Sequence, residues 1–220
     1  MGSSRAGCRS LGLALVLLAT VAGAAATEWT EPSTGERFPL VRAGSQGALE
    51  LTGGGVRKKL VFKVYAFALY ADPAALRDGL AAWRGRPAKA LRADPAVYDA
   101  LAGLPAERLA VLAFVREVDS RSMREALDEA IARAVPAGDA ARERFLGFWT
   151  GTIAAGEKIE LSFSRSGEVT LARGGREVGR VASPALARAL LACWLGQQTV
   201  SQDIRDGVVE RLPAILGAPK

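Results

Sequence analysis

The sequence predicts an α+β fold in which a large antiparallel sheet carries helices on one of its faces. Long apolar stretches rich in Val, Phe and Tyr precede residue 71, and three short alternating segments joined by Gly-containing turns follow residue 157. Asp-Pro and Ser-Pro pairs, which are typical of helix starts, lie between and after these segments. No repeat or low-complexity linker interrupts the pattern, so we expect residues 27–220 to form one domain.

The first predicted strands cover residues 47–53 and 58–70. The glycine cluster Gly53–Gly55 interrupts the apolar pattern between them. Such a cluster either turns the chain or lets the backbone lie close to another segment. Asp72 and Pro73 then start a helix that we expect to reach Trp83, and Asp94 and Pro95 start another that ends near Gly103.

The middle of the chain contains one ambiguous segment and two clear helices. Residues 108–118 form a buried strand or a helix, which periodicity alone does not separate. Asp119 or Ser120 caps a helix that stops at Pro136–Gly138, and Asp139 begins another that runs to about Trp149. The first of these helices has an apolar stripe formed by Met123, Ala126, Leu127, Ala130, Ile131 and Ala134.

The last third of the chain predicts a three-stranded antiparallel meander followed by helices. The three strands are residues 158–164, 169–172 and 177–181. Ser183 and Pro184 cap a helix that runs to Leu195, with Gly196 as its stop. A final helix is expected from about Ser201 to Leu216.

The N-terminus has the pattern of a cleaved signal peptide, which we assign to residues 1–26. Arg5 and Arg9 form its basic part, residues 11–21 its apolar part, and residues 22–26 supply small side chains for cleavage. The apolar part is too short for a transmembrane helix, and no second long apolar run follows. We therefore expect a periplasmic or secreted protein without a transmembrane anchor.

Composition excludes several kinds of site. The chain contains no histidine, which rules out Ser-His-Asp and Cys-His catalysis and removes the commonest zinc ligand. Cys193 is the only cysteine outside the predicted signal peptide, and its apolar surroundings favour a small buried side chain. The Lys and Arg residues are scattered among Asp and Glu, which argues against a nucleic-acid partner. We expect no metal, no cofactor and no catalytic residue.

The candidate ligand-binding residues are Arg57, Tyr65 and Tyr70. An arginine beside a glycine cluster, followed by tyrosines on an apolar strand, offers a cation and hydroxyl donors next to apolar surface. This combination suits a small amphipathic anion. The same residues also fit a solvated arginine and tyrosines at the edge of the core.

Two stretches together resemble the chalcone isomerase-like family. The first is LELTGGGVRKKLVFKVYAFALYADP, with Gly-x-Gly-x-Arg at residues 53–57 and a strand that begins Lys-Val-Tyr at residue 63 and ends Leu-Tyr at residue 70. The second begins IELSFSRSGEVTLARGG and includes Trp-Leu-Gly at residues 194–196. The resemblance implies an open-faced β-sandwich, in which a large antiparallel sheet has helices layered on one face.

The resemblance also bears on activity. Plant chalcone isomerases hold polar residues at positions that fall here on Tyr65 and near Phe114, Met123, Ala130 and Cys193, so most of their catalytic network is missing. An arginine kept at residue 57, with tyrosine in place of threonine at residue 65, resembles the fatty-acid-binding branch of the family. There the arginine and tyrosine bind the ligand carboxylate, which makes Arg57 and Tyr65 the implied anion-binding pair.

The spacing of this pair requires a bend in the chain. An uninterrupted strand of eight residues would span roughly 26 Å. The pair can therefore share one carboxylate only if a turn or bulge lies between them, which we expect near Arg57–Lys59. The favoured function is non-catalytic binding of a fatty acid or a phenolic molecule. The alternatives are an intramolecular lyase (isomerase) acting on a phenolic or enone substrate, and an accessory protein whose cleft is closed.

Overall fold

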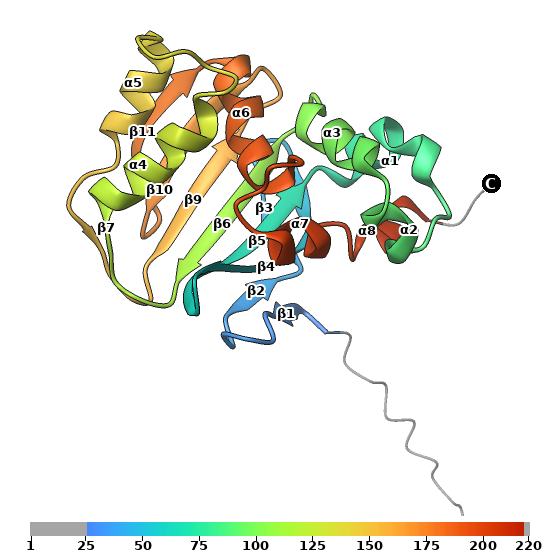
Figure 1. The fold of residues 1–220 in the computed structure, drawn as a ribbon. Coiled ribbons are helices and arrows are strands. Elements are labelled where there is room, and N and C mark those ends of the chain that lie inside the picture. Colours follow the sequence, from blue (N-terminus) through green and yellow to red (C-terminus); the bar gives the residue numbers. More distant parts are fainter. Residues whose placement is uncertain (1–25, 218–220) are drawn as a thin grey trace, which may run out of the picture.

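The computed structural model describes residues 26–217 and consists of a seven-stranded antiparallel sheet with helices on one face (Figure 1). The predicted α+β fold is confirmed. The strand order is β11-β10-β9-β6-β5-β4-β3. These strands are β3 (Val41–Ala43), β4 (Ala48–Lys59), β5 (Phe62–Ala71), β6 (Arg108–Phe114), β9 (Lys158–Phe163), β10 (Glu168–Arg173) and β11 (Arg176–Ala182). The predicted signal peptide lies almost entirely outside the described residues.

The helices bury the larger of two apolar clusters between themselves and the sheet. They are α1 (Pro73–Gly79), α2 (Ala88–Arg92), α3 (Pro95–Gly103), α4 (Ser120–Ile131), α5 (Ala140–Gly147), α6 (Pro184–Leu195), α7 (Gln202–Gly207) and α8 (Leu212–Leu216), with a 3₁₀ turn at Ala81–Trp83. Helix α6 is the centre of this layer, and eight of its twelve residues are buried. None of the helices between residues 26 and 217 is both long and apolar enough to cross a membrane.

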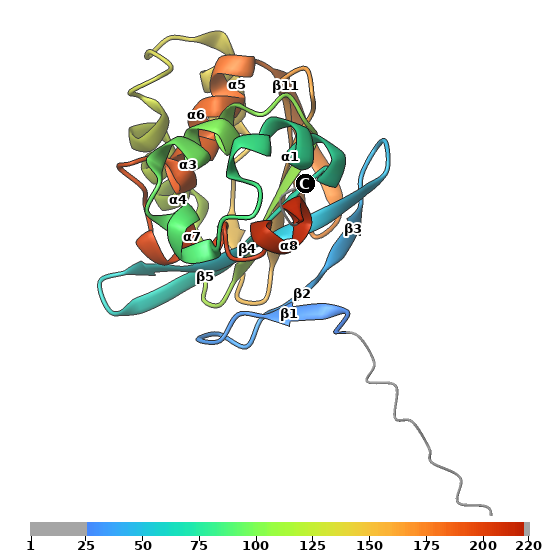
Figure 2. The same cartoon turned by 90° about the vertical axis from the view of Figure 1, so that its right-hand side faces the viewer.

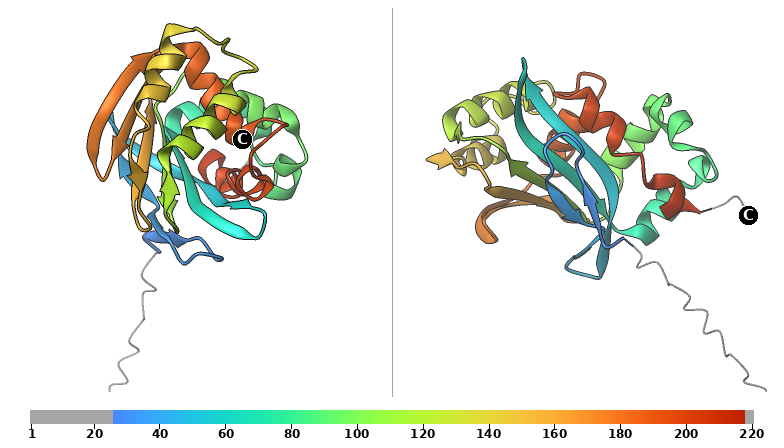
Figure 3. Two further views of the ribbon diagram at one scale, coloured as in Figure 1. Left: turned by 60° about the vertical axis from the view of Figure 1, so that its left-hand side comes forward. Right: turned by 90° about the horizontal axis from the view of Figure 1, so that it is seen from below.

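The opposite face of the sheet carries a small hairpin, β1 (Glu28–Thr30) and β2 (Arg37–Pro39), as the views in Figure 3 show. Phe38 from this hairpin is buried in a second apolar cluster with Leu51 and Tyr70 of the sheet. A further two-stranded sheet joins β7 (Val118–Asp119) to β8 (Thr152–Ile153) at the end of β6. The sheet is therefore covered by helices on one face and by a single hairpin on part of the other.

Several predicted elements are confirmed. The meander is β9, β10 and β11, and the ambiguous segment at residues 108–118 is the buried strand β6. The side chains of Asp72, Asp94, Asp119, Asp139 and Ser183 all accept hydrogen bonds from the first turns of the helices that they were predicted to start. A short polar side chain directly before a helix was thus a dependable signal of its start.

Three predicted boundaries are wrong. The glycine cluster does not end a strand, because β4 continues through it to Lys59, and the chain turns at Leu60 and Val61 inside the predicted strand 58–70. The predicted helix over residues 73–83 ends at Gly79 and continues as a 3₁₀ turn. The predicted final helix is two short helices, α7 and α8, separated by residues 208–211.

The glycines of β4 serve close packing and not a turn. A Cβ atom on Gly53 would lie 2.0 Å from the Gly207 oxygen, and one on Gly55 would lie 2.5 Å from the Asp203 oxygen, both on α7. Helix α7 therefore packs directly on the backbone of β4, which no larger residue would permit. Ser201, the N-cap of α7, also donates a hydrogen bond of 2.8 Å from Oγ to the Val56 oxygen. These contacts hold the strand that carries Arg57.

Candidate functional site

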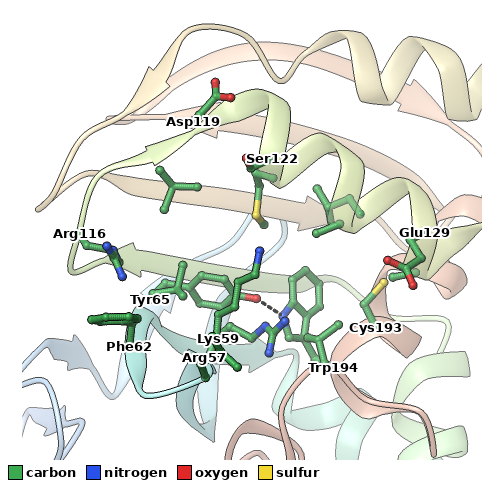
Figure 4. Close-up of a pocket in the computed structure, with 18 of the residues that line it drawn as sticks. Arg57, Lys59, Phe62, Tyr65, Arg116, Asp119, Ser122, Glu129, Cys193 and Trp194 are labelled. Atoms are coloured by element: carbon green, nitrogen blue, oxygen red, sulfur yellow. Dashed lines mark hydrogen bonds between the residues drawn. The ribbon is translucent and has the colours of Figure 1, made fainter.

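A cleft opens between the end of the β4–β5 hairpin and helix α4, with the C-terminal end of α6 along one side (Figure 4). Its volume is about 540 Å³. The main lining residues are Arg57, Lys59, Leu60, Phe62, Val64 and Tyr65 from the hairpin, Arg116 to Asp119 from the loop and strand after β6, Ser122, Met123, Ala126, Leu127, Glu129 and Ala130 from α4, and Cys193, Trp194 and Val200 from α6 and the segment after it.

Arg57 and Tyr65 are direct cross-strand partners in this cleft. In the register of β4 and β5, Arg57 lies opposite Tyr65, while Lys58 lies opposite Lys63. The register shifts between these two pairs, which is a β-bulge, and the chain reverses at Leu60–Val61. The predicted bend therefore exists as a bulge at Arg57/Lys58 followed by a hairpin turn. Directly paired residues have Cβ atoms about 5 Å apart on the same face, so both side chains are available to one ligand.

Tyr65 presents a neutral hydroxyl at the buried end of the cleft. Its side chain is 3% exposed, and the Trp194 Nε1–H donates a hydrogen bond of 3.0 Å to its oxygen. Among the described residues the Tyr65 hydroxyl has no acceptor for its own proton. Burial raises its pKa to about 12, against the opposing effects of the Trp194 hydrogen bond and the charge of Arg57. At neutral pH it therefore remains a donor, and the Trp194 bond polarises it toward donation.

The mouth of the cleft is basic on the hairpin side. Arg57 donates from Nη1 to the Lys58 carbonyl oxygen at 2.7 Å and forms no ion pair within residues 26–217. Lys59 and Arg116 lie on the same side of the mouth (Figure 4). Of the three carboxylates that line the cleft, Asp119 and Glu129 lie on the opposite rim, and Glu117 follows Arg116 in the loop after β6. The cleft thus has a cationic edge, a neutral hydroxyl and an apolar wall.

Tyr70, the third predicted site residue, does not belong to this cleft. Successive side chains alternate between the faces of a strand, so Tyr65 and Tyr70, five residues apart, point to opposite faces. Tyr70 is buried in the cluster beneath the β1–β2 hairpin and donates a hydrogen bond of 2.9 Å to the Pro39 carbonyl oxygen. Burial raises the pKa of its hydroxyl. The structure therefore brings Arg57 and Tyr65 together and separates Tyr70 from them.

Sequence reasoning missed the part that Trp194 plays. Trp194 is buried in the core, and its indole N–H also donates a hydrogen bond to the Tyr65 oxygen. Its place in the Trp-Leu-Gly motif that carries the family resemblance was the available signal.

Met123, Ala130 and Cys193 also line the cleft, at positions where the resemblance places polar residues in plant chalcone isomerases. Burial raises the pKa of the Cys193 thiol to about 12, which makes it a poor nucleophile.

Comparison with known proteins identifies the family. The sequence model described as chalcone isomerase-like matches residues 39–209. The chain belongs to the chalcone isomerase-like family. The resemblance seen in the two sequence stretches is therefore confirmed, and the match includes both the β4–β5 hairpin and helix α6. A search of curated protein sequences found no match.

The chain is also similar in structure to the fatty-acid binding protein AtFAP1 of Arabidopsis thaliana. The two superpose with a TM-score of 0.73 and 24% sequence identity, and the match covers 86% of this chain and 98% of AtFAP1. At this level of identity the comparison shows a shared fold. Among residues 26–217 no cluster of three Cys, Asp or Glu side chains is placed to hold a metal ion.

Proposed function

We propose that this chalcone isomerase-like protein binds a fatty acid or a similar amphipathic anion in the cleft at Arg57, without converting it. The observation that carries the proposal is the cross-strand pair of Arg57 and Tyr65, at which a guanidinium and a neutral hydroxyl meet at an apolar cleft. A hydrogen bond from a guanidinium to a carboxylate is charge-assisted and stronger than a neutral one. The Tyr65 hydroxyl supplies a second donor.

The rest of the cleft suits an acyl chain. Met123, Leu127 and Val64 give it an apolar lining, and each buried CH₂ group contributes about 0.8 kcal/mol. A volume of about 540 Å³ lies within the usual range for small-molecule sites. An open cleft of this size argues against the alternative of an accessory protein whose cleft has closed.

The lining residues also favour binding over isomerisation. Ring closure in plant chalcone isomerases uses a polarised ketone and a network of hydroxyl groups. Among residues 26–217, only Tyr65 and Ser122 bring side-chain hydroxyls to the cleft. The Tyr65 hydroxyl stays protonated well above neutral pH, so it is a poor general base. Turnover of naringenin chalcone above the spontaneous rate would establish the alternative, an intramolecular lyase.

We further propose that the protein is exported and acts in the periplasm or outside the cell. The support is the basic, apolar and small-residue pattern of residues 1–26. N-terminal sequencing of the protein recovered from the periplasmic fraction of an expressing bacterium should begin near residue 27. Recovery of the intact chain only from the cytoplasm would contradict export and leave the binding proposal untouched.

Binding is tested with palmitate and three variants. Arg57→Gln removes the positive charge and its charge-assisted hydrogen bond, and Tyr65→Phe removes the hydroxyl donor. Arg176→Gln changes an exposed arginine in the β10–β11 hairpin, outside the cleft. Losing a hydrogen bond to a charged group costs about 1.5–3 kcal/mol, so Arg57→Gln should weaken binding by about 10- to 100-fold. Tyr65→Phe should weaken it by a smaller factor, and Arg176→Gln should match the wild type.

Calorimetry supplies the affinities, and native mass spectrometry shows whether an acyl ligand copurifies with the wild type and is lost in Arg57→Gln. Equal palmitate affinity in Arg57→Gln and Arg176→Gln would remove Arg57 from the site. Absence of any palmitate binding by the folded wild type would overturn the proposed function.

A further inference from the structure

The tip of the β4–β5 hairpin exposes three consecutive apolar side chains beside the mouth of the cleft. Leu60 is 89% exposed, Val61 84% and Phe62 56%, whereas only two other large apolar residues in the described part of the chain are exposed. The hairpin projects from the body of the protein, away from the helices (Figure 2). Leu60 and Phe62 also line the cleft, and Val61 does not.

The backbone conformation at this tip is one that a leucine rarely adopts. Leu60 has a φ of 55°, and it is the only residue other than glycine with a positive φ between residues 26 and 217. Glycine and asparagine adopt this conformation at lower cost, and they dominate two-residue hairpin turns. A leucine here costs folding stability, and its side chain makes no compensating burial. Nothing in the described part of the fold therefore favours a leucine at this position.

Positive charge surrounds these three side chains. Residues 57–64 read RKKLVFKV, with four cations and no acidic residue. Lys58 is paired with Asp203 at 2.9 Å, whereas Arg57, Lys59 and Lys63 form no ion pair within the described residues. The guanidinium of Arg116 lies 4.8 Å from the centre of the Phe62 ring. Asp119 and Glu129 lie on the opposite rim, on the α4 side, and Glu117, next to Arg116, is the one acidic residue that lines the cleft from the loop after β6.

We propose that this tip docks on a bilayer containing anionic phospholipids, so that an acyl ligand passes between the membrane and the cleft. Leu60, Val61 and Phe62 would enter the interfacial region, and the surrounding cations would contact lipid phosphates. Passage of the ligand rests on the proposed function, whereas docking does not. A stable protein interface buries about 800 Å² on each partner, far more than three side chains offer, which favours a lipid surface as the occupant.

Docking is tested by sedimentation of the ligand-free protein with vesicles of phosphatidylglycerol and phosphatidylethanolamine, and with neutral phosphatidylcholine vesicles. The wild type should bind the anionic vesicles, and binding should fall as salt rises. Val61→Asp should weaken this binding by about tenfold or more, because it places a charge at the inserted position. Val41→Asp is the matched control, since Val41 is 54% exposed on β3, away from the tip, and its variant should bind like the wild type.

Docking would be overturned if the wild type did not bind anionic vesicles or bound neutral vesicles equally well. It would also be overturned if Val61→Asp and Val41→Asp weakened vesicle binding equally. Self-association of the wild type that Val61→Asp abolishes, without vesicle binding, would assign the tip to a second copy and also overturn it. Transfer of a fluorescent fatty acid from anionic vesicles to the protein should be slower for Val61→Asp than for the wild type. The affinity of the two proteins for this fatty acid in vesicle-free buffer should be the same. A failure of palmitate binding in vesicle-free buffer concerns the proposed function alone.

Discussion

Arg57 on β4 and Tyr65 on β5 are direct partners on neighbouring strands, although they lie eight positions apart in the sequence. The two-residue turn at Leu60–Val61 and the bulge at Arg57/Lys58 create this pairing. The same hairpin therefore supplies both donors of the candidate site and, at its tip, the exposed apolar residues. A binding site and an entry route for its ligand can arise from one local element.

The raised pKa of Tyr65 predicts a stability loss at alkaline pH. The folded protein holds this proton up to about pH 12, whereas the unfolded chain releases it near pH 10. Its contribution to stability is therefore fully present below pH 10 and is lost as the pH rises from 10 to 12. A shift of two pKa units corresponds to about 2–3 kcal/mol as an upper bound.

Urea unfolding of wild type and Tyr65→Phe between pH 7 and pH 12 measures this contribution. The difference in unfolding free energy between the two proteins should stay constant to pH 9, which serves as an internal control, and shrink by about 2 kcal/mol by pH 12. The wild type must be compared with Tyr65→Phe because burial also raises the pKa of Tyr70. Ionisation of Tyr70 therefore lowers the unfolding free energy of both proteins at alkaline pH. A difference that stays constant to pH 12 would contradict the burial of an ionisable Tyr65.

The Cys193 thiol should be unreactive in the folded protein. Burial raises its pKa from 9.0 to about 12, so the thiolate fraction at pH 8 falls by about 10³-fold. A Cys8→Ser variant leaves Cys193 as the only thiol, and its reaction with an aromatic disulfide reagent should be slower in buffer than in urea by at least this factor. Palmitate should slow it further, because Cys193 lines the cleft. A native rate within tenfold of the unfolded rate would contradict this prediction.

Much of the fold could be predicted because it follows from local signals. Asp and Ser caps mark five helices, and Gly-containing turns mark the meander, since these residues bind or bend their own backbone. The pairing of Arg57 with Tyr65 was implied by the family resemblance. A period of two places Tyr70 on the other face of the strand, so its exclusion from the cleft could also have been predicted.

The turn at Leu60–Val61 could not be predicted in the same way. Neither residue favours a turn, and both fit the apolar strand that surrounds them. The glycine cluster at residues 53–55 suggested a turn earlier in the chain. Gly53 and Gly55 instead allow backbone contact with α7, about 150 residues further along the chain. Such contacts between distant segments leave no local pattern. The break between α7 and α8 was missed for the same reason, since the Arg211 N–H binds the Thr52 oxygen of β4 at 3.0 Å.

The packing of α7 on β4 predicts that Gly207→Ala is strongly destabilising. A Cβ atom on Gly207 would lie 1.8 Å from the Gly54 carbonyl oxygen, and backbone on both sides prevents simple relief. Separating the two segments should cost about 2–3 kcal/mol of unfolding free energy.

Gly147→Ala is the matched control, because a Cβ atom on Gly147 in α5 meets nothing within 4 Å. Helix propensity there should make alanine neutral or stabilising by up to about 1 kcal/mol. Thermal and urea unfolding of both variants measures the contrast, and equal stability would show that α7 does not rest on the β4 backbone.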